Sequence, residues 1–135
     1  MAKASGLGWT TLSVDNSAGT AKDIRNDITD LQFSTPRAVQ DITGIDKSAM
    51  ERLLLLADFS IDLKGVFNAA TDKSHDVFKT VPSTSVNRTV SLTVNGVSLP
   101  NECLFTDYQL SRSSSGELTW SAPGVLSDGT VPTWA

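Results

Sequence analysis

The stretch LLLLADFSIDLKGVFN, residues 53–68, changes its pattern half-way along. Four leucines are too few to cross a bilayer, which takes about 20 apolar residues, and charged residues follow them at once. From Phe59 onward, apolar residues alternate with the polar side chains of Ser60, Asp62 and Lys64. A period of two predicts a β-strand with one buried and one solvent-facing side. We therefore expect a strand that begins within or just after the leucines.

Strand-like segments recur along most of the chain, separated by Gly, Asn and Ser turn signals. Residues 87–96 alternate regularly and end in Asn95-Gly96, which is typical of a tight hairpin turn. Near the C-terminus, Leu118 and Trp120 are expected to face the core. The segments predicted as strands are residues 6–14, 28–35, 58–67, 87–96, 97–113 and 117–125.

Residues 71–81 form the segment with the clearest helical pattern. Thr71 or Asp72 is suited to cap its first turn, because a side-chain oxygen there can accept a free backbone N–H. An apolar stripe follows, and Pro82 prevents the helix from continuing. Seven or eight strands with one helix predict a mainly β protein, namely an antiparallel β-sandwich or small barrel with one flanking α-helix, in a single domain spanning residues 1–135.

Residues 37–54 do not follow one pattern. DITG, residues 41–44, is typical of a strand that enters a turn. SAMERLLLL, residues 48–56, is either a helix, with Ser48 as its cap and Glu51 at the third position, or a loop that leads into the next strand. Because a long polar connection in a small domain often carries function, we expect this excursion to have a role of its own.

Composition and charge argue against several classes of protein. The 135 residues carry a formal net charge of −4 without a cluster of Lys or Arg, so tight binding to nucleic acid is not expected. This charge suits a surface that nucleic acid touches without sticking to it. Residues 1–9 lack the apolar stretch of a signal peptide, so we interpret the Asn-Arg-Thr triplet at 87–89 as a chance match to the glycosylation pattern. Cys103, the single cysteine, is expected to be buried and unreactive.

No combination of residues predicts catalysis or metal binding. His75 is the single histidine, and we expect it to be solvated on the surface of the helix. Paired acids, such as Asp58 with Asp62 and Asp27 with Asp30, lie on polar faces of amphipathic segments and are expected to be solvated rather than to face each other across a cleft. The sequence therefore predicts a protein that is not an enzyme and needs no cofactor or metal.

The tryptophans leave a carbohydrate-binding role open. Trp120 alternates with Leu118 and is interpreted as a core residue. Trp9 and Trp134 lie near the termini, where they either close the ends of the fold or face a neighbouring subunit.

The order of these segments resembles the major tail (tail tube) proteins of long-tailed bacteriophages. The matching elements in chain order are VDNSAGTAKDI from residue 14, the Asp-x-Thr at 41–43, DFSIDLKGVFN at 58–68 and LFTDYQLSRSSSGELTWSAPG at 104–124. The resemblance covers nearly the whole chain, and the order of the elements carries it rather than any one motif.

The resemblance implies a β-sandwich with a flanking helix. Copies of such a protein form six-subunit rings that stack into a tube, through which the genome leaves the capsid. The implied partners are other copies of the chain, the tape-measure, tail-tip and terminator proteins, and viral DNA in transit, without membrane binding by the chain itself. The implied location is the virion tail, after assembly in the host cytoplasm, and no additional C-terminal domain is expected.

The resemblance also implies that the excursion reaches the neighbouring subunit or the next ring. Replacing Asp41 or Asp46 with Lys is expected to block stacking. Two other functions stay open: a tail terminator or head-to-tail connector, which would stop at one ring, and a carbohydrate-binding β-sandwich, which would stay monomeric. The candidate subunit-contact residues are Val39, Asp41, Thr43, Ile45, Asp46, Lys47 and Arg52.

Overall fold

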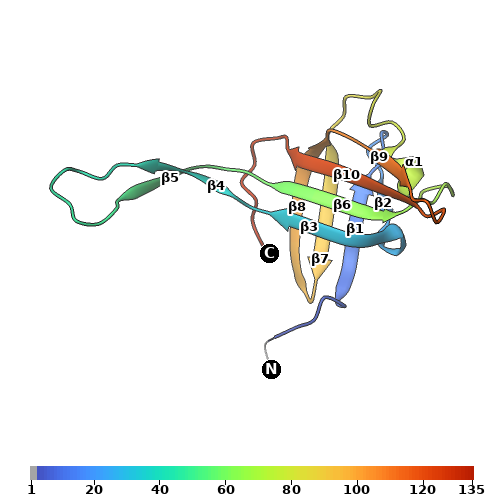
Figure 1. Ribbon diagram of the computed structural model, residues 1–135, viewed down its shortest axis with the longest axis horizontal. Helices are drawn as coiled ribbons and strands as arrows, with labels where there is room; N and C mark the ends of the chain where they lie inside the picture. Colours follow the sequence, from blue (N-terminus) through green and yellow to red (C-terminus); the bar gives the residue numbers. More distant parts are fainter. Residues whose placement is uncertain (1–2) are drawn as a thin grey trace.

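A curved antiparallel sheet forms the body of the protein in the computed structural model, which describes residues 3–135 (Figure 1). A separate two-stranded hairpin projects from one end of this body. The elements of the body are β1 (Trp9–Asp15), β2 (Ala21–Asp23), the 3₁₀ turn η1 (Arg25–Asp27), β3 (Ile28–Ser34), β6 (Ser60–Val66), α1 (Ser74–Phe78), β7 (Arg88–Val94), β8 (Val97–Phe105), β9 (Gln109–Arg112) and β10 (Leu118–Leu126), and the hairpin consists of β4 (Arg37–Asp41) and β5 (Arg52–Ala57).

The body sheet curls without closing. Its strands follow the order β2-β1-β7-β8-β10-β6-β3, with β9 also paired to β10. Trp9 of β1 lies edge-on to Phe33 of β3, with ring centroids 6.4 Å apart, so the two sides of the sheet approach each other. Within residues 3–135 no hydrogen-bonded ladder joins β1 to β3. The predicted mainly β, antiparallel fold with a flanking helix is thus confirmed, in the form of an open curled sheet.

The core fills the inside of this curl. In β6, Ile61 and Leu63 are buried while Asp62 and Lys64 point outward, as the alternation predicts. Trp120 of β10 is also buried, which confirms its predicted place. The inward prediction for Leu118 was wrong. It is the first residue of β10, beside the end of β9, and its side chain is exposed.

Helix α1 is shorter than predicted and is capped differently. Asp72 has a φ of 65°, in the left-handed region, so a helix cannot begin there. The helix begins at Ser74, and its backbone N–H donates to Asp27 Oδ2 at 3.0 Å rather than to Thr71 or Asp72. Asn68 Nδ2 donates to the other oxygen of Asp27 at 2.9 Å. Asp27 is therefore a buried structural acceptor, not the solvated acid expected from the sequence.

The aromatic face of α1 joins the helix to the sheet. Phe78 packs against Phe105 and Trp120, with ring centroids 5.1 and 5.2 Å away. His75 is half-buried, 4.8 Å from the ring of Phe67, and its Nδ1 lies 3.1 Å from the hydroxyl of Tyr108. The prediction of a solvated histidine was therefore wrong. In the described part of the chain, no helix has the length and apolar character needed to cross a bilayer.

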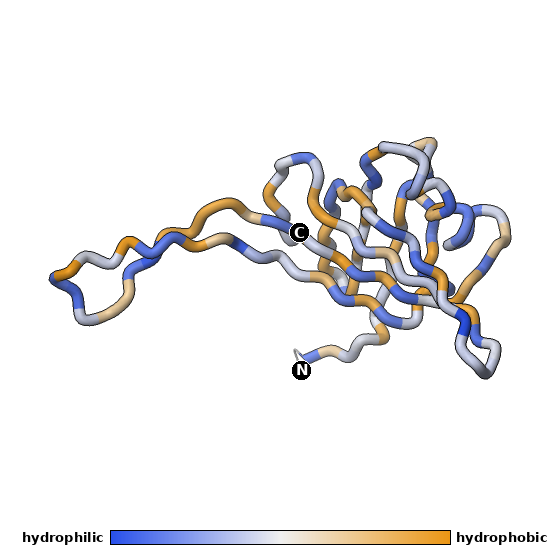
Figure 2. The backbone as a smooth tube through the Cα atoms, turned by 45° about the horizontal axis from the view of Figure 1, so that its top comes forward, coloured by the Kyte–Doolittle hydropathy of each residue, from blue (hydrophilic) through white to orange (hydrophobic). Residues whose placement is uncertain are grey.

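The projecting hairpin, residues 37–57, is called the arm below. Figure 2 shows it extending away from the body, with apolar stretches along its strands. The four leucines form most of β5, so the helical alternative for residues 48–56 was wrong. The predicted strand after the leucines is confirmed as β6, but Asp58 and Phe59 separate it from β5. The leucines and the alternating segment therefore belong to two different sheets.

Two connections shape the end of the body near the arm. Asn95 and Gly96 have φ values of 50° and 85°, which confirms the predicted tight turn between β7 and β8. The segment after β10 runs back across the body, and the backbone of Ala135 exchanges hydrogen bonds with Ser98 at 2.9 and 3.1 Å. Trp134 then lies against Phe33, with ring centroids 5.9 Å apart.

Candidate functional site

The arm carries the largest concentration of exposed apolar side chains among the described residues. Leu53, Leu54 and Leu56 are 50%, 62% and 85% exposed, and Val39 on the facing strand is 50% exposed. Monomeric soluble proteins rarely leave such a contiguous patch in water, and patches of this kind mark interaction sites. The arm is therefore the strongest candidate for a binding surface on this chain.

Hydrogen bonds shape the tip of the arm. The Thr43 hydroxyl accepts from the backbone N–H of Glu51 at 2.8 Å and lies 2.6 Å from Asp41 Oδ1. The backbone N–H of Thr43 also donates to Asp41 Oδ1, at 2.9 Å. These bonds from Thr43 hold the pKa of Asp41 below its usual value. Asp41 and Thr43 thus set the shape of the tip.

The root of the arm is joined to the body through backbone hydrogen bonds. The Asp58 N–H donates to the Pro36 carbonyl at 2.9 Å, at the point where the two strands leave the body. Arg37 reaches across the hairpin and donates to the Leu55 carbonyl from Nη2 at 2.8 Å and from Nε at 3.2 Å. The pairing shifts by one residue between Arg37 and Val39, which marks a bulge beside this contact.

The structure brings all the predicted contact residues together on the arm. Val39 and Asp41 lie in β4, Arg52 lies opposite Asp41 in β5, and the other four lie in the connecting loop. Ile45 is fully exposed at the loop, while Asp46 pairs with Lys47 across 3.8 Å. The role of these seven residues in subunit contact stays a prediction.

The sequence reasoning missed the leucines of β5 as contact residues. It treated the excursion as polar and assigned the leucines to a helix or to the start of the next strand. A signal was present, because four consecutive apolar residues in a strand place apolar side chains on both of its faces. Such a strand needs a cover on each side, and the arm alone provides none.

The outward face of the body sheet is poor in cations and carries mostly polar side chains, with the exposed apolar side chains of Val66, Leu104 and Val125 among them. Cross-strand neighbours there are mainly hydroxyl side chains, such as Ser13 opposite Ser91 and Thr11 opposite Thr93. Lys64 is the one cation in the following set. The polar residues on this face include Thr11, Ser13, Asp30, Gln32, Ser60, Asp62, Lys64, Thr89, Ser91, Thr93, Ser98, Glu102, Thr119 and Ser121.

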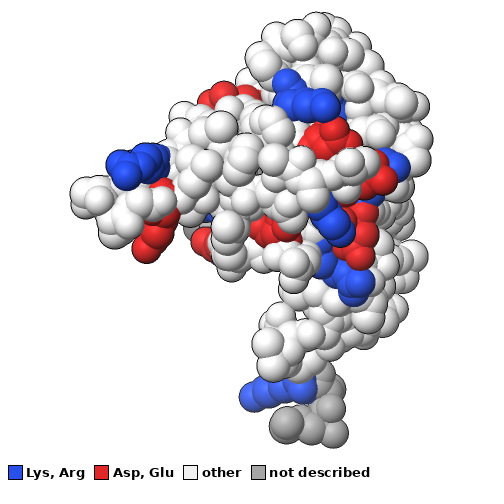
Figure 3. Space-filling model, turned by 90° about the vertical axis from the view of Figure 1, so that its right-hand side faces the viewer, with Lys and Arg blue, Asp and Glu red and all other residues white. Residues whose placement is uncertain are grey.

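The pole opposite the arm shows mixed charge. In Figure 3, Lys and Arg side chains are interspersed with Asp and Glu on this side of the molecule, without a continuous basic surface. Because binding to phosphate backbones depends on such basic surfaces, this side offers no electrostatic footprint for a duplex.

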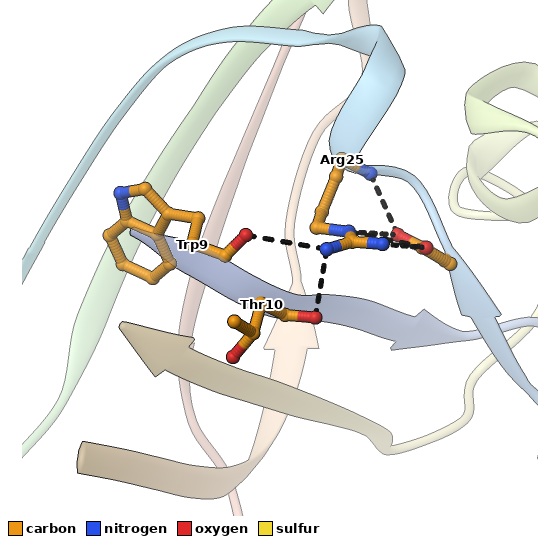
Figure 4. Close-up of polar contacts among 4 residues, drawn as sticks. Trp9, Thr10 and Arg25 are labelled. Carbon is orange, nitrogen blue, oxygen red and sulfur yellow. Dashed lines mark hydrogen bonds and ion pairs between the residues drawn. The ribbon is translucent and has the colours of Figure 1, made fainter. Parts of the chain in front are cut away.

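A groove of about 510 Å³ lies between β1 and β3, where the sheet fails to close. Arg25 lies beside it, and Figure 4 shows its guanidinium donating to the carbonyls of Trp9 and Thr10, at 3.3 and 2.9 Å. Arg25 also pairs with Asp23 at 3.0 Å. Burial opposes ionisation of Asp23, but the hydrogen bonds from Arg25 lower its pKa. Arg25 is thus engaged by groups of its own chain and caps the edge of β1.

The tryptophans do not form a common platform for a sugar ring. Trp120 is buried against Phe78, and its indole N–H donates to the Val66 carbonyl at 3.0 Å. Trp9 and Trp134 both pack against Phe33 at the gap between β1 and β3. Trp134 is nevertheless 48% exposed, so both predicted roles, closing the ends of the fold and facing a neighbouring subunit, stay predictions.

The groups that could carry chemistry are dispersed or buried. Within residues 3–135, no three His, Cys, Asp or Glu side chains lie close enough together to hold a metal ion. Cys103 is fully buried, as predicted. Burial, with smaller effects of Glu102 and Asp128, raises the pKa of its thiol to about 12.

No protein-family model matches the chain, and no curated protein matches it in sequence. The tail of an empty gene transfer agent (GTA) particle, solved by helical refinement with C6 symmetry, contains a chain that aligns with a TM-score of 0.71 and 16% identity over 98% of each chain. The chain has the fold of this tail protein. The virion of the native GTA particle gives a TM-score of 0.68 and 16% identity, over 97% of this chain and 99% of that one. The expected resemblance to tail proteins is thus confirmed at the level of the fold.

Proposed function

We propose that this chain is a structural subunit of a phage-like tail tube. In this role it forms six-subunit rings that stack into a hollow tube, is located in the virion, and conducts the genome during ejection. The observation that carries the proposal is an exposed apolar arm on a chain whose fold matches a GTA tail protein over nearly its whole length. A subunit that functions alone would have no use for such an arm.

Two further features support the tube. The arm lies at one end of the body, so identical copies can make head-to-tail contacts, which extend without limit once a ring has closed. The outward face of the sheet, poor in Lys and Arg, suits the lumen, because DNA must pass along it without being held. The proposed partners are other copies of the chain and the tape-measure, tail-tip and terminator proteins. The proposed role is structural rather than catalytic.

The test is negative-stain electron microscopy of the purified protein at rising concentration. Hollow tubes of uniform width with six-fold end views are the expected result. Single rings that never stack would contradict the tube and would indicate a terminator or connector protein instead. A monomer at every concentration would contradict self-assembly of the chain on its own and would call for a screen of glycan binding.

A further inference from the structure

The arm joins the body through a narrow neck, which consists of Thr35, Pro36 and Asp58. The ladder between β3 and β6 ends at Ser34, and the pairing of the arm itself begins at Arg37. Between these positions Pro36 has no backbone N–H to donate. Within the described chain, a single backbone hydrogen bond therefore crosses the neck, from the Asp58 N–H to the Pro36 carbonyl at 2.9 Å.

A neck with so little pairing does not by itself fix the angle between arm and body, because successive ladder hydrogen bonds are what align two strands. The angle then depends on the side chains that flank the neck. Phe33 lies just before the neck and Phe59 just after it, with ring centroids 6.1 Å apart. Phe59 is fully buried, whereas Phe33 is half-buried and meets Trp9 of β1 edge-on. Phe33 is therefore the less firmly held side of the neck.

The segment after β10, residues 127–135, is called the strap below, and it connects the two sides of the neck. At its start, Leu126 at the end of β10 donates its backbone N–H to the Phe59 carbonyl at 2.9 Å. At its far end, Trp134 lies against Phe33, with ring centroids 5.9 Å apart. In Figure 1 this dark red segment passes beside the root of the arm. The strap thus reaches both phenylalanines from one continuous stretch of chain.

The far end of the strap can open without unfolding the core. Trp134 is 48% exposed, so one side of its indole covers Phe33 while the other faces solvent. Its neighbour Ala135 is tied to β8 by the two backbone hydrogen bonds with Ser98. Residues 128–133 lie in no strand and are mainly exposed, and the core includes no residue of the strap. Segments with so few buried contacts open at a low free-energy cost.

We propose that the strap is a latch that sets the direction of the arm, with Trp134 as the residue that closes it. While Trp134 lies on Phe33, the neck is held against the sheet and the arm points in one direction. When Trp134 leaves, the arm swings about Pro36 and Asp58. An arm held at one angle loses less conformational freedom when it binds. The latch belongs to the single chain and does not depend on assembly into a tube.

The distance between two spin labels, measured by double electron–electron resonance, reports the direction of the arm. One label is attached to the arm as Arg52→Cys in β5 and the other to the body as Thr10→Cys in β1, both at exposed positions. Cys103→Ala removes the native thiol. The chain is kept dilute so that distances within one molecule are measured. The unsubstituted strap should give a narrow distribution, and Trp134→Ala should at least double its width.

Two matched variants separate the latch from a general effect of altering the strap. Trp134→Phe keeps an aromatic ring on Phe33 and should preserve the narrow distribution. Val131→Ala shortens a side chain of the same strap that is 63% exposed, and it should have no effect. The latch would be overturned by a Trp134→Ala distribution as narrow as that of the unsubstituted strap, by equal broadening in Val131→Ala, or by a broad distribution before any change to the strap.

Hydrogen exchange of the native cysteine-containing chain provides a second test without labels. The Asp58 N–H makes the bond that crosses the neck, so its exchange rate measures how often the neck opens. Trp134→Ala should raise this rate at least tenfold. The Leu63 N–H lies in β6, between β3 and β10, and its rate should stay unchanged because the sheet remains folded. An unchanged rate at Asp58, or an equal increase at Leu63, would contradict a latch that acts on the neck.

Discussion

At the scale of single residues, a few buried polar groups hold the elements of the body together. Asp27 is the clearest case, because it lies on η1 yet accepts hydrogen bonds from Asn68 and from the first residue of α1. Asp27 is 4% exposed, so water does not replace these bonds if they are lost. The carboxylate thus caps a helix that lies about 50 residues further along the chain.

Replacing this carboxylate should destabilise the body. Asp27→Ala leaves the Ser74 N–H and the Asn68 amide without their acceptor, and we expect the free energy of unfolding to fall by about 2 kcal/mol. Asp30→Ala, which removes an exposed carboxylate from the neighbouring strand, is the matched control and should change it by less than about 0.5 kcal/mol. Urea titration of both variants measures the difference, and equal values would exclude the cap.

The Cys103 thiol should lose its proton at mildly alkaline pH only in the unfolded chain. Its pKa is raised from 9.0 to about 12, so the folded chain keeps the proton where the unfolded chain begins to lose it. The stabilisation is therefore fully present below about pH 9, the ordinary pKa of the thiol, and is lost as the pH rises from there toward about 12. A thiol reagent at pH 8 should label the protein in urea but not in buffer. The Cys103→Ala variant should lack this contribution to the alkaline loss of stability, and rapid labelling of the native protein would contradict burial of the thiol.

At the scale of elements, alternation was informative where one face of a strand is buried. Ile61 and Leu63 show this in β6. Asn95-Gly96 indicated the hairpin between β7 and β8, because a tight two-residue turn of this kind requires positive φ angles. The strand-like pattern of residues 28–35 likewise found β3. The short β2 escaped notice because its three residues carry no apolar period.

The arm could not be predicted from alternation, because neither of its faces is buried in the isolated chain. The sequence predicted that Val39 and the other contact candidates lie on one excursion, and the structure shows that this excursion is a hairpin. DITG, residues 41–44, indicated the turn that follows β4, but the sequence could not show the hairpin itself, since β4 and β5 pair across a long loop. The cap of α1 was missed for a related reason: Asp27 is remote in sequence, and only the fold brings it to Ser74.

The crossing of η1 and β6 should tolerate no side chain at Gly65. A Cβ atom there would lie 1.8 Å from the carbonyl oxygen of Asp27, which belongs to the backbone and cannot rotate away. Gly65→Ala should therefore lower the free energy of unfolding by about 3 kcal/mol. Gly6→Ala, at a site with open space, should leave it nearly unchanged, and a similar result for both variants in thermal unfolding would contradict the close approach.

At the scale of the whole molecule, stability and assembly are separated between body and arm. The core clusters inside the curled sheet and contains no residue of the arm. Substitutions in the arm should therefore change association while leaving the folding of the body unaltered. This separation makes the arm suitable for testing the proposed function.

Asp46→Lys is the cleanest charge reversal in the arm. Asp46 is exposed in the loop, whereas Asp41 accepts the hydrogen bonds from Thr43 that shape the tip, so Asp41→Lys would also disturb the arm itself. The Asp46→Lys arm becomes cationic beside Lys47, and we expect stacking to be blocked, with a critical concentration at least about tenfold higher, or about 1.4 kcal/mol. Thermal unfolding should be unchanged. Tubes of normal length by electron microscopy would count against this placement of the contact.

The arm is neutral on an acidic chain, and this has a consequence for ionic strength. Its three cations, Arg37, Lys47 and Arg52, balance its three anions, Asp41, Asp46 and Glu51. Added salt shortens the screening length from about 10 Å at 0.1 M to about 3 Å at 1 M, which weakens repulsion between bodies that each carry the formal charge of −4. The exposed leucines of the arm are apolar, and contacts that they form on assembly do not depend on that screening. Concentrated salt should therefore speed the growth of assemblies and slow their dissolution, so that dilution into low-salt buffer becomes the condition under which the subunits separate.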